Sequence, residues 1–250
     1  ELGARHKIPR IRNPEYNNTV RLIKDELGLS MSINPEQAAA REILRAIRFS
    51  NSIKVSSFAK GRIELAEVKI KENSPLSNMR ICDINRRMKS EVLFVAVQRN
   101  GEVIIPNGNT VIYEKDRVTL TGSTTQLEKF FIRVGILSDR TVSEVMIVGG
   151  GRITYYLTNM LLELGMDVKI IEINKEKCVN LVEKFPQATV IHGDGTDHEL
   201  LLSESLEEMD AFIALTDNDE ENVIISMFAQ NHGVTHVLMK TLFGFPTNGI

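Results

Sequence analysis

The second half of the chain alternates between short apolar runs and longer segments in which apolar residues recur every three or four positions. The segment "ITYYLTNMLLELG" places Leu157 and Leu161 on one helical face and ends at Gly165, a residue that favours helix termination. Strands that alternate with helices of this length predict βαβ units. We therefore predict an α/β fold for residues 138–250, with a Rossmann-type parallel sheet and helices on both faces. The predicted strands cover 144–148, 167–173, 188–194, 210–216 and 235–241, and the helices cover 153–165, 174–185, 197–204 and 218–233.

The middle of the chain has a different pattern, with strand-like alternation in several short runs. "RIELAEVKI" alternates as a half-buried strand does, and "SEVLFVAVQRNGEVIIP" contains the hairpin signal Asn100-Gly101 between two apolar runs. Several strands with few helices predict a small α+β domain over residues 51–137. The predicted strands cover 62–70, 90–106 (as a hairpin) and 116–122, and the helices lie within 73–88 and 123–135.

The first residues of the chain resemble the last ones. "GARHKIPRIRNPEY", from Gly3, aligns without a gap with "GVTHVLMKTLFGFP", from Gly233, so that Arg10 matches Lys240. A repeat of such a long period indicates a tandem array of two-domain units and not a solenoid. We therefore expect residues 1–50 to hold the last strand of a first Rossmann unit and its crossover helices. The chain would then end at the equivalent strand of a second unit.

Two helices are predicted after that first strand, over 17–28 and 34–49. The second has Asn34 as its N-cap, Pro35 at its first helical position and Glu36 in its first turn. Its apolar stripe is wide enough to pack on another body. Two interpretations remain open: the stripe packs on the helix's own sheet, or it docks on a neighbouring domain or subunit. The stripe consists of Ala39, Ile43, Leu44 and Ile47.

Composition limits the possible partners and compartments. The 250 residues are 42% hydrophobic and 25% charged, as in ordinary globular proteins, and the chain is long enough for more than one domain. The net charge of −3 gives no electrostatic reason to expect nucleic acid, which requires a concentrated basic face. No apolar run approaches the ~18 residues that span a bilayer. Cys82 and Cys178 form no motif, which suits a reducing cytosol.

The stretch "EVMIVGGGRITYYL" combines a predicted strand, a glycine turn and the start of a helix. Compared with the dinucleotide fingerprint G-x-G-x-x-G, Gly149 supplies the tight turn and Gly151 lets the backbone approach a pyrophosphate. Thr154 stands where the third glycine would allow a helix and a strand to pack closely. This departure leaves the phosphate-facing amides intact, and Arg152 at the helix start could neutralise phosphate.

Polar residues also follow the other predicted strands, at the sheet edge where ligands bind in open α/β folds. Glu172 ends the second strand and is suited to hold ribose hydroxyls. Its carboxylate would repel a 2′-phosphate, which favours NAD or an adenosine nucleotide over NADP. The alternative is a solvated glutamate at a strand end. The remaining candidates are Asp194 and Gly195 after the third strand, Thr216 and Asp217 after the fourth, and Lys240 at the end of the fifth.

A metal site is the alternative for the loop after the third strand, where His192, Asp194, Asp197 and His198 lie close in sequence. Their order mixes strand, loop and helix-start positions, and no second pair of zinc ligands exists, so we expect no metal. Catalytic motifs are also missing, since the sequence contains no Tyr-x-x-x-Lys, no G-x-x-x-x-G-K-[ST] and no G-x-S-x-G. We therefore expect the nucleotide to be a ligand and not a reactant.

These motifs resemble those of a known family. "VMIVGGGRI", "GDGTD" and "ALTDNDEENV" are similar to the nucleotide-binding RCK/KTN domain (RCK-N), and "RNGEVIIPNGNTVIYEKDRVTLTGS" is similar to another part of an RCK array, as found in TrkA-like regulatory subunits. The resemblance implies that residues 1–50 end a first RCK-N domain, that 51–137 form an RCK-C domain and that 138–250 form a second RCK-N domain. The family's binding positions carry over to Gly149, Gly150, Gly151, Arg152, Ile153, Glu172, Asp194, Thr216, Asp217 and Lys240, with Arg10 as the match in the truncated first unit.

The same resemblance implies a regulatory function. Proteins of this family form a cytosolic ring, a homo-oligomeric dimer or tetramer, beneath a membrane potassium translocation subunit of the TrkH/TrkG type. NAD(H), ATP or ADP then changes the gating of that subunit. We therefore expect a gating subunit that is not an enzyme and that lies in the cytoplasm at the inner face of the cell membrane. An NAD-dependent oxidoreductase and a Rossmann scaffold that assembles without nucleotide are the alternatives.

Overall fold

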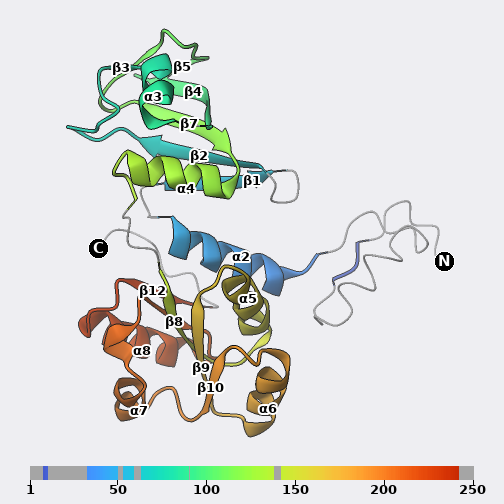
Figure 1. Cartoon of the computed structure of the whole chain (residues 1–250). Coiled ribbons are helices and arrows are strands. Elements are labelled where there is room, and N and C mark those ends of the chain that lie inside the picture. Colours follow the sequence, from blue (N-terminus) through green and yellow to red (C-terminus); the bar gives the residue numbers. More distant parts are fainter. Residues whose placement is uncertain are drawn as a thin grey trace, which may run out of the picture. The chain divides into compact units, whose positions relative to one another are not determined.

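The computed structural model describes residues 8–10, 33–49, 53–58, 63–89, 91–137 and 142–241. They form two compact units (Figure 1). The Rossmann unit contains residues 142–241 and helix α2 (Pro35–Arg48) as far as Ile47, and the antiparallel unit contains the described residues from Arg48 to 137. The predicted helix over 17–28 and most of the strand predicted before it lie outside the described residues. No helix within the described ranges is long and apolar enough to cross a membrane.

Five parallel strands form the sheet of the Rossmann unit, in the order β10-β9-β8-β11-β12. The strand order reverses beside β8, between β8 and β11. The predicted Rossmann-type parallel sheet is confirmed. Its elements are β8 (Glu144–Val148), α5 (Arg152–Glu163), β9 (Asp167–Glu172), α6 (Lys175–Lys184), β10 (Thr189–His192), α7 (His198–Ser203), a 3-10 turn (Leu206–Glu208), β11 (Ala211–Ala214), α8 (Asp219–Asn231) and β12 (His236–Met239).

Helices cover both faces of this sheet because its strands bury side chains on both sides (Figure 1). In β8, Val145 and Ile147 are buried in one core, which includes residues of α5 and α6. Met146 and Val148 are buried in the other core, which includes residues of α7 and α8. The glycine stop predicted for α5 is present, since Gly165 has a φ of +76°.

Helix α2 packs on the face of the sheet that α5 covers. Ala40 and Ile47 are buried in the same hydrophobic core as Leu157 and Leu161 of α5, and other residues of the α2 stripe pack against that core. The buried alanine is Ala40 and not the predicted Ala39, which is only partly buried. The stripe thus packs on the sheet of residues 142–241, within the same compact unit.

The antiparallel unit contains a five-stranded sheet in the order β1-β2-β7-β4-β5 and a separate ribbon formed by β3 and β6. The predicted α+β character is confirmed, but β1 and the ribbon were not predicted. Two serines interrupt the apolar alternation of β1, and the strands of the ribbon are too short to leave a pattern. The elements are β1 (Ile53–Phe58), β2 (Ile63–Lys69), β3 (Met79–Arg80), α3 (Ile81–Met88), β4 (Leu93–Arg99), β5 (Glu102–Ile104), β6 (Val111–Ile112), β7 (Arg117–Gly122) and α4 (Thr124–Arg133).

The hairpin between β4 and β5 forms at the predicted position. Asn100 and Gly101 have φ angles of 52° and 87°, the left-handed conformation that a type I′ turn requires at both of its central positions. Arg99 and Glu102 pair across this turn. The local sequence is therefore sufficient to set the register of β4 against β5.

A buried ion pair links the end of β4 to the start of β7. Asp116 is only 1% exposed and accepts two hydrogen bonds from Arg99, of 2.8 and 2.9 Å, and one of 2.8 Å from the Tyr113 amide. Burial by itself raises the pKa of Asp116, but the hydrogen bonds and the charge of Arg99 outweigh it, so that the pKa lies below its ordinary value. The ionised carboxylate therefore stabilises the fold.

The lowered pKa of Asp116 predicts acid sensitivity. The ionised form stabilises the fold above the unfolded-state pKa of about 3.9, and this contribution is lost as the pH falls below it towards the folded pKa. We expect Asp116→Asn to lower the free energy of unfolding by about 1–3 kcal/mol at pH 7, and the difference from wild type to shrink at acidic pH. Urea unfolding followed by circular dichroism at several pH values measures this. Asp83→Asn, in the exposed pair with Arg86, is the control, and a difference for Asp116→Asn that does not change with pH would contradict the assignment.

Candidate nucleotide-binding site

The glycine turn follows β8 directly, and its first residue, Gly149, lies where no side chain fits. Gly149 has a φ of +102°, and its amide donates a 2.8 Å hydrogen bond to the carbonyl of Ile171 at the end of β9. A Cβ atom at Gly149 would lie 2.7 Å from the carbonyl oxygen of Leu215, which follows β11. Both the backbone conformation and the close approach therefore require glycine here.

The next two glycines differ in what surrounds them. A Cβ atom at Gly150 would lie 2.8 Å from Oε2 of Glu172 and 2.9 Å from Cδ1 of Leu181. A Cβ atom at Gly151 would meet nothing within 4 Å, and Gly151 has an ordinary extended conformation, with φ of −80°. Gly151 lines the pocket described below, so the absence of its side chain leaves room for a ligand close to the backbone.

Thr154, which replaces the third glycine of the dinucleotide fingerprint, fits into the packed structure. Its side chain is fully buried, and its hydroxyl donates a hydrogen bond to the carbonyl of Gly149. The hydroxyl thus satisfies a carbonyl of the turn while α5 stays packed on the sheet. The missing third glycine does not prevent the helix from starting at the turn.

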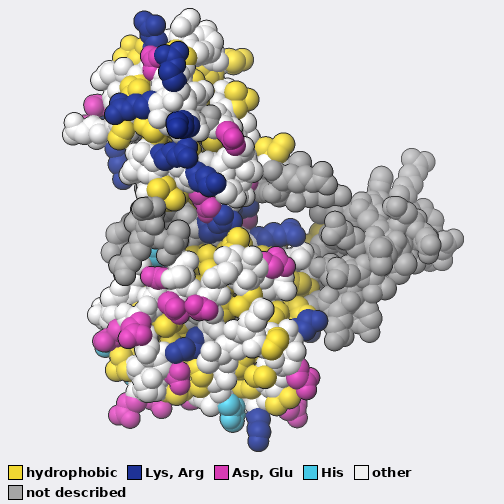
Figure 2. All heavy atoms as spheres, viewed as in Figure 1, with side chains coloured by type: hydrophobic (Ala, Val, Ile, Leu, Met, Phe, Trp, Pro, Cys, Tyr) yellow, Lys and Arg dark blue, Asp and Glu magenta, His cyan; other side chains and the backbone are white. Residues whose placement is uncertain are grey.

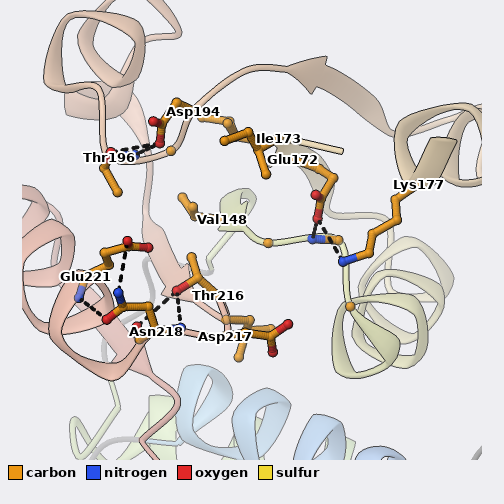
Figure 3. Close-up of a pocket in the computed structure, with 16 residues that line it drawn as sticks. Val148, Glu172, Ile173, Lys177, Asp194, Thr196, Thr216, Asp217, Asn218 and Glu221 are labelled. Carbon is orange, nitrogen blue, oxygen red and sulfur yellow. Dashed lines mark hydrogen bonds and ion pairs between the residues drawn. The ribbon is translucent and has the colours of Figure 1, made fainter. Parts of the chain in front are cut away.

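A pocket of about 430 Å³ lies beyond the carboxyl ends of β8, β9 and β11, where the strand order reverses (Figure 3). Ligands of open α/β sheets bind at such switch points. The structure brings eight of the predicted site residues together in its lining. They are Gly149, Gly150, Gly151, Glu172, Asp194, Gly195, Thr216 and Asp217.

Four other predicted residues do not line this pocket. Lys240 lies at its rim, where its Nζ is 3.1 Å from Oδ1 of Asp217. Arg152 is exposed at the start of α5, whereas Ile153 packs against the hydrophobic core. Arg10 lies 3.8 Å from Glu36 of α2, in an ion pair away from the pocket lining. The glycines predicted to contact phosphate through their backbone therefore line the pocket, whereas the predicted cations Arg152 and Lys240 do not.

Glu172 is buried, which excludes the alternative of a solvated glutamate at a strand end. It is 4% exposed, and its Oε2 accepts a 2.5 Å hydrogen bond from the Gly150 amide. Its Oε1 accepts a 2.7 Å hydrogen bond from the Asn174 amide, and Nζ of Lys177 lies 3.9 Å from Oε2. A carboxylate oxygen accepts more than one hydrogen bond, so both oxygens keep capacity for ribose hydroxyls.

The loop after β10 forms a second wall of the pocket. One oxygen of Asp194 accepts hydrogen bonds from the Thr196 amide, 2.9 Å, and hydroxyl, 2.8 Å, and these two bonds lower the pKa of Asp194 below its ordinary value. Gly195 packs on Val148, whose Cγ1 would lie 2.1 Å from a Cβ atom at Gly195. The loop therefore stays close to the end of β8 and keeps an ionised carboxylate at the pocket.

Asn222 supports the third wall and was missed by the sequence analysis. It is fully buried, and its Oδ1 accepts hydrogen bonds from the amide, 3.0 Å, and hydroxyl, 2.8 Å, of Thr216. Its Nδ2 donates a 3.0 Å hydrogen bond to the carbonyl of Lys240. Asn222 thus joins the ends of β11 and β12. An asparagine between the acidic first turn of α8 and its apolar run was the available signal.

The charged side chains around the pocket are mainly acidic. Glu172, Asp194, Asp217 and Glu221 line it together with one lysine, Lys177 (Figure 3). Figure 2 shows the same bias on the visible face of the Rossmann unit, where Asp and Glu predominate, whereas Lys and Arg gather on the visible face of the antiparallel unit. An anion in this pocket must therefore be held mainly by backbone amides.

The N-terminus of α5 provides such amides. Helices α6, α7 and α8 each have a side-chain N-cap, supplied by Asn174, Asp197 and Asn218. The N-cap residue of α5 is Gly151, which has no side chain. No side-chain cap therefore satisfies the amides of the first turn of α5. A phosphate group satisfies such amides and interacts favourably with the helix dipole.

The histidines and carboxylates of the loop after β10 do not converge on a metal position. The ring of His192 contacts the Ile173 carbonyl, Asp197 caps α7, and His198 stacks on Phe228 with ring centroids 3.9 Å apart. Among the described residues, no group of three or more His, Cys, Asp or Glu side chains is arranged to hold a metal ion. The arrangement gives no support to the metal alternative.

Fold and pocket together define a Rossmann-type domain with a glycine turn, joined in one chain to a small antiparallel α+β unit. Residues 145–241 match the TrkA-N domain and residues 65–133 match the TrkA-C domain. The chain belongs to the TrkA family, and the resemblance noted in the sequence is confirmed.

Known relatives agree with this assignment. The chain is 31% identical over 240 residues to a Trk system potassium uptake protein TrkA homolog of Archaeoglobus fulgidus, covering 96% of this chain and 54% of the relative. It is 34% identical to TrkA of Halomonas elongata, covering 93% and 51%. The GsuK channel bound to NAD has a similar fold, with a TM-score of 0.55 and 18% identity over 93% of this chain and 40% of that one. The chain thus spans about half the length of the curated relatives it matches.

The surroundings of the glycine turn predict that one alanine substitution destabilises the fold and that another has almost no effect on its stability. Gly149→Ala forces a side chain into the left-handed region and against the Leu215 carbonyl, so we expect it to lower the free energy of unfolding by at least roughly 1–3 kcal/mol. Gly151→Ala points into open space and should change that free energy by less than about 0.5 kcal/mol. Urea unfolding of both variants measures the difference. Equal destabilisation would show that the turn is not packed as described.

Proposed function

We propose that the pocket binds an adenosine nucleotide, NAD(H) or ATP/ADP, with its diphosphate against the glycine turn and the start of α5. The uncapped α5 N-terminus beside the open side of Gly151 is the observation that carries this proposal. The pocket volume of about 430 Å³ falls within the usual range for small-molecule sites, about 300–1,000 Å³. Arg152 follows Gly151 in the chain and Lys240 pairs with Asp217, and because Gly151 and Asp217 line the pocket, both cations are candidates to contact a phosphate that extends beyond it.

Different walls of the pocket would contact the ribose and the base of the nucleotide. Glu172, held in place by two backbone amides, accepts hydrogen bonds from the ribose hydroxyls. The Asp194 loop and the exposed Ile173, which lines the pocket, form the side on which a base would lie. Lys177 offsets part of the negative charge at Glu172. This arrangement suits a nucleotide with free ribose hydroxyls.

Several observations support a regulatory role over an enzymatic one. The described residues that line the pocket include no histidine, tyrosine or cysteine, so acid–base or nucleophilic chemistry would depend on its carboxylates, its threonines or Lys177. The curated relatives are named as Trk system potassium uptake proteins, and none of the names quoted above is that of an enzyme. An NAD-dependent oxidoreductase remains the alternative, to be tested by steady consumption of NADH with a substrate.

We further propose that the chain is part of a regulatory subunit of a potassium uptake system. In this proposal, residues 1–50 end a first RCK-N domain, 51–137 form RCK-C and 138–250 form a second RCK-N. The subunit forms a homo-oligomer and acts from the cytoplasm on a membrane potassium translocation subunit. The family assignment and the names of the relatives support this organisation.

Isothermal titration of the 250-residue chain with NADH, NAD, ATP and ADP tests the site. We expect saturable binding of at least one of them, and Gly151→Asp to weaken it by at least about tenfold because a carboxylate then lies beside the phosphates. The matched control is Gly108→Asp in the antiparallel unit, where a Cβ atom would be 3.5 Å from Cβ of Cys82, an ordinary contact. The control should bind as wild type does. No binding of any nucleotide would favour a scaffold role.

The position of Glu172 predicts selectivity against a 2′-phosphate. Wild type should bind NAD more tightly than NADP, and Glu172→Gln should reduce this difference because it removes the negative charge and keeps the side-chain shape. Titration of both dinucleotides into both proteins gives the ratio of affinities. An unchanged ratio would place the ribose elsewhere in the pocket. Circular dichroism is needed beside it, since Glu172 also holds two backbone amides.

A further inference from the structure

Helix α5 is tied directly to the glycine turn, so a change at the turn is passed to the start of the helix. The Thr154 hydroxyl donates to the Gly149 carbonyl, and the Tyr155 amide donates a 3.1 Å hydrogen bond to the Gly151 carbonyl. Both donors belong to the first turn of α5. A ligand held by the amides of the glycine turn would therefore also fix the position of that helical turn.

Tyr156, the next residue of α5, connects the helix to a distant part of the chain. It is 7% exposed, and its hydroxyl accepts a 2.7 Å hydrogen bond from Nδ2 of Asn34. Asn34 is at the same time the N-cap of α2, because its Oδ1 accepts a 2.8 Å hydrogen bond from the Gln37 amide. One asparagine side chain therefore joins the start of α2 to the first turns of α5.

Apolar packing continues this contact along the two helices. Ala40 and Ile47 of α2 share a core with Leu157 and Leu161 of α5. Apolar packing has no preferred direction, whereas the part-buried hydrogen bond between Asn34 and Tyr156 requires one relative position of the two side chains. Helix α2 also runs without a break from Ile47 into Arg48, the first residue of the antiparallel unit.

We propose that Asn34 and Tyr156 are positioning residues that couple nucleotide occupancy of the pocket to helix α2. Helix α2 is then the element through which the pocket acts on the rest of the chain. The proposal rests on the nucleotide site proposed above. A ligand changes α2 only by its different affinities for the docked and the loosened arrangements of that helix, and the hydrogen bond creates this difference.

Hydrogen–deuterium exchange of the whole chain tests the coupling, in the absence and presence of whichever of NADH, NAD, ATP and ADP binds most tightly. In wild type, the nucleotide should slow exchange of the α2 amides by at least about fivefold, the lower end of typical coupling. Tyr156→Phe keeps the buried ring and removes the hydroxyl. We expect it to abolish the slowing in α2 while the nucleotide affinity stays unchanged, because α2 remains docked most of the time and the affinity reports the docked form.

Two further variants separate the hydrogen bond from packing. Tyr155→Phe is the matched control, since Tyr155 packs on Phe185 with ring centroids 5.0 Å apart and its hydroxyl makes no hydrogen bond to the described residues. It should keep the wild-type response. Asn34→Ser keeps an N-cap for α2 but lacks the amide donor, so it should behave like Tyr156→Phe even if that variant folds poorly.

The outcomes distinguish the coupling from the site itself. If wild type binds none of the nucleotides, the proposed site is wrong and the coupling falls with it. If wild type binds but exchange in α2 does not change, only the coupling is wrong. Slowing that persists in both Tyr156→Phe and Asn34→Ser would also overturn it, because apolar packing alone would then transmit the effect.

Discussion

The crowding around Gly149 is the constraint on which the pocket depends. The amide of Gly149 bonds to the end of β9, and its α-carbon lies against the Leu215 carbonyl beyond β11. No side chain fits there. Gly149 adopts a positive φ, and the chain enters α5 three residues later, at Arg152. The ends of three strands are thereby held together around one turn. The position of the pocket, of Glu172 and of α5 follows from that turn.

Electrostatics of the pocket separate two tasks. The charged side chains are mainly acidic, as suits hydroxyl and amino groups, whereas the backbone at the start of α5 has amides without a side-chain cap, which suit an anion. Glu172 links both tasks because it holds the Gly150 amide and lines the cavity. A ligand that combines phosphate with free ribose hydroxyls satisfies both parts at once. An inorganic anion would satisfy only one.

The first turns of α5 contact the glycine turn on one side and, through Tyr156 and Asn34, helix α2 on the other. Helix α2 in turn leads by its backbone into the antiparallel unit. In the proposed coupling, a ligand at the glycine turn acts on α2 through these two contacts.

The sequence alone determined the parallel sheet, the hairpin at Asn100-Gly101 and eight residues of the pocket lining, because strand periodicity, glycine turns and strand ends are local signals. It did not determine the partners of those residues. Glu172 is buried by its surroundings, and Asn222 bonds to residues at two different strand ends. Asn34 bonds to Tyr156, which lies far from it in the chain. Arg152, Ile153 and Lys240 were placed at the site by motif, yet in the tertiary structure Arg152 is exposed at the start of α5, Ile153 packs against the core and Lys240 pairs with Asp217 at the rim. Only the fold decides which side chains meet, because a sequence pattern specifies a residue's own backbone and not its distant neighbours.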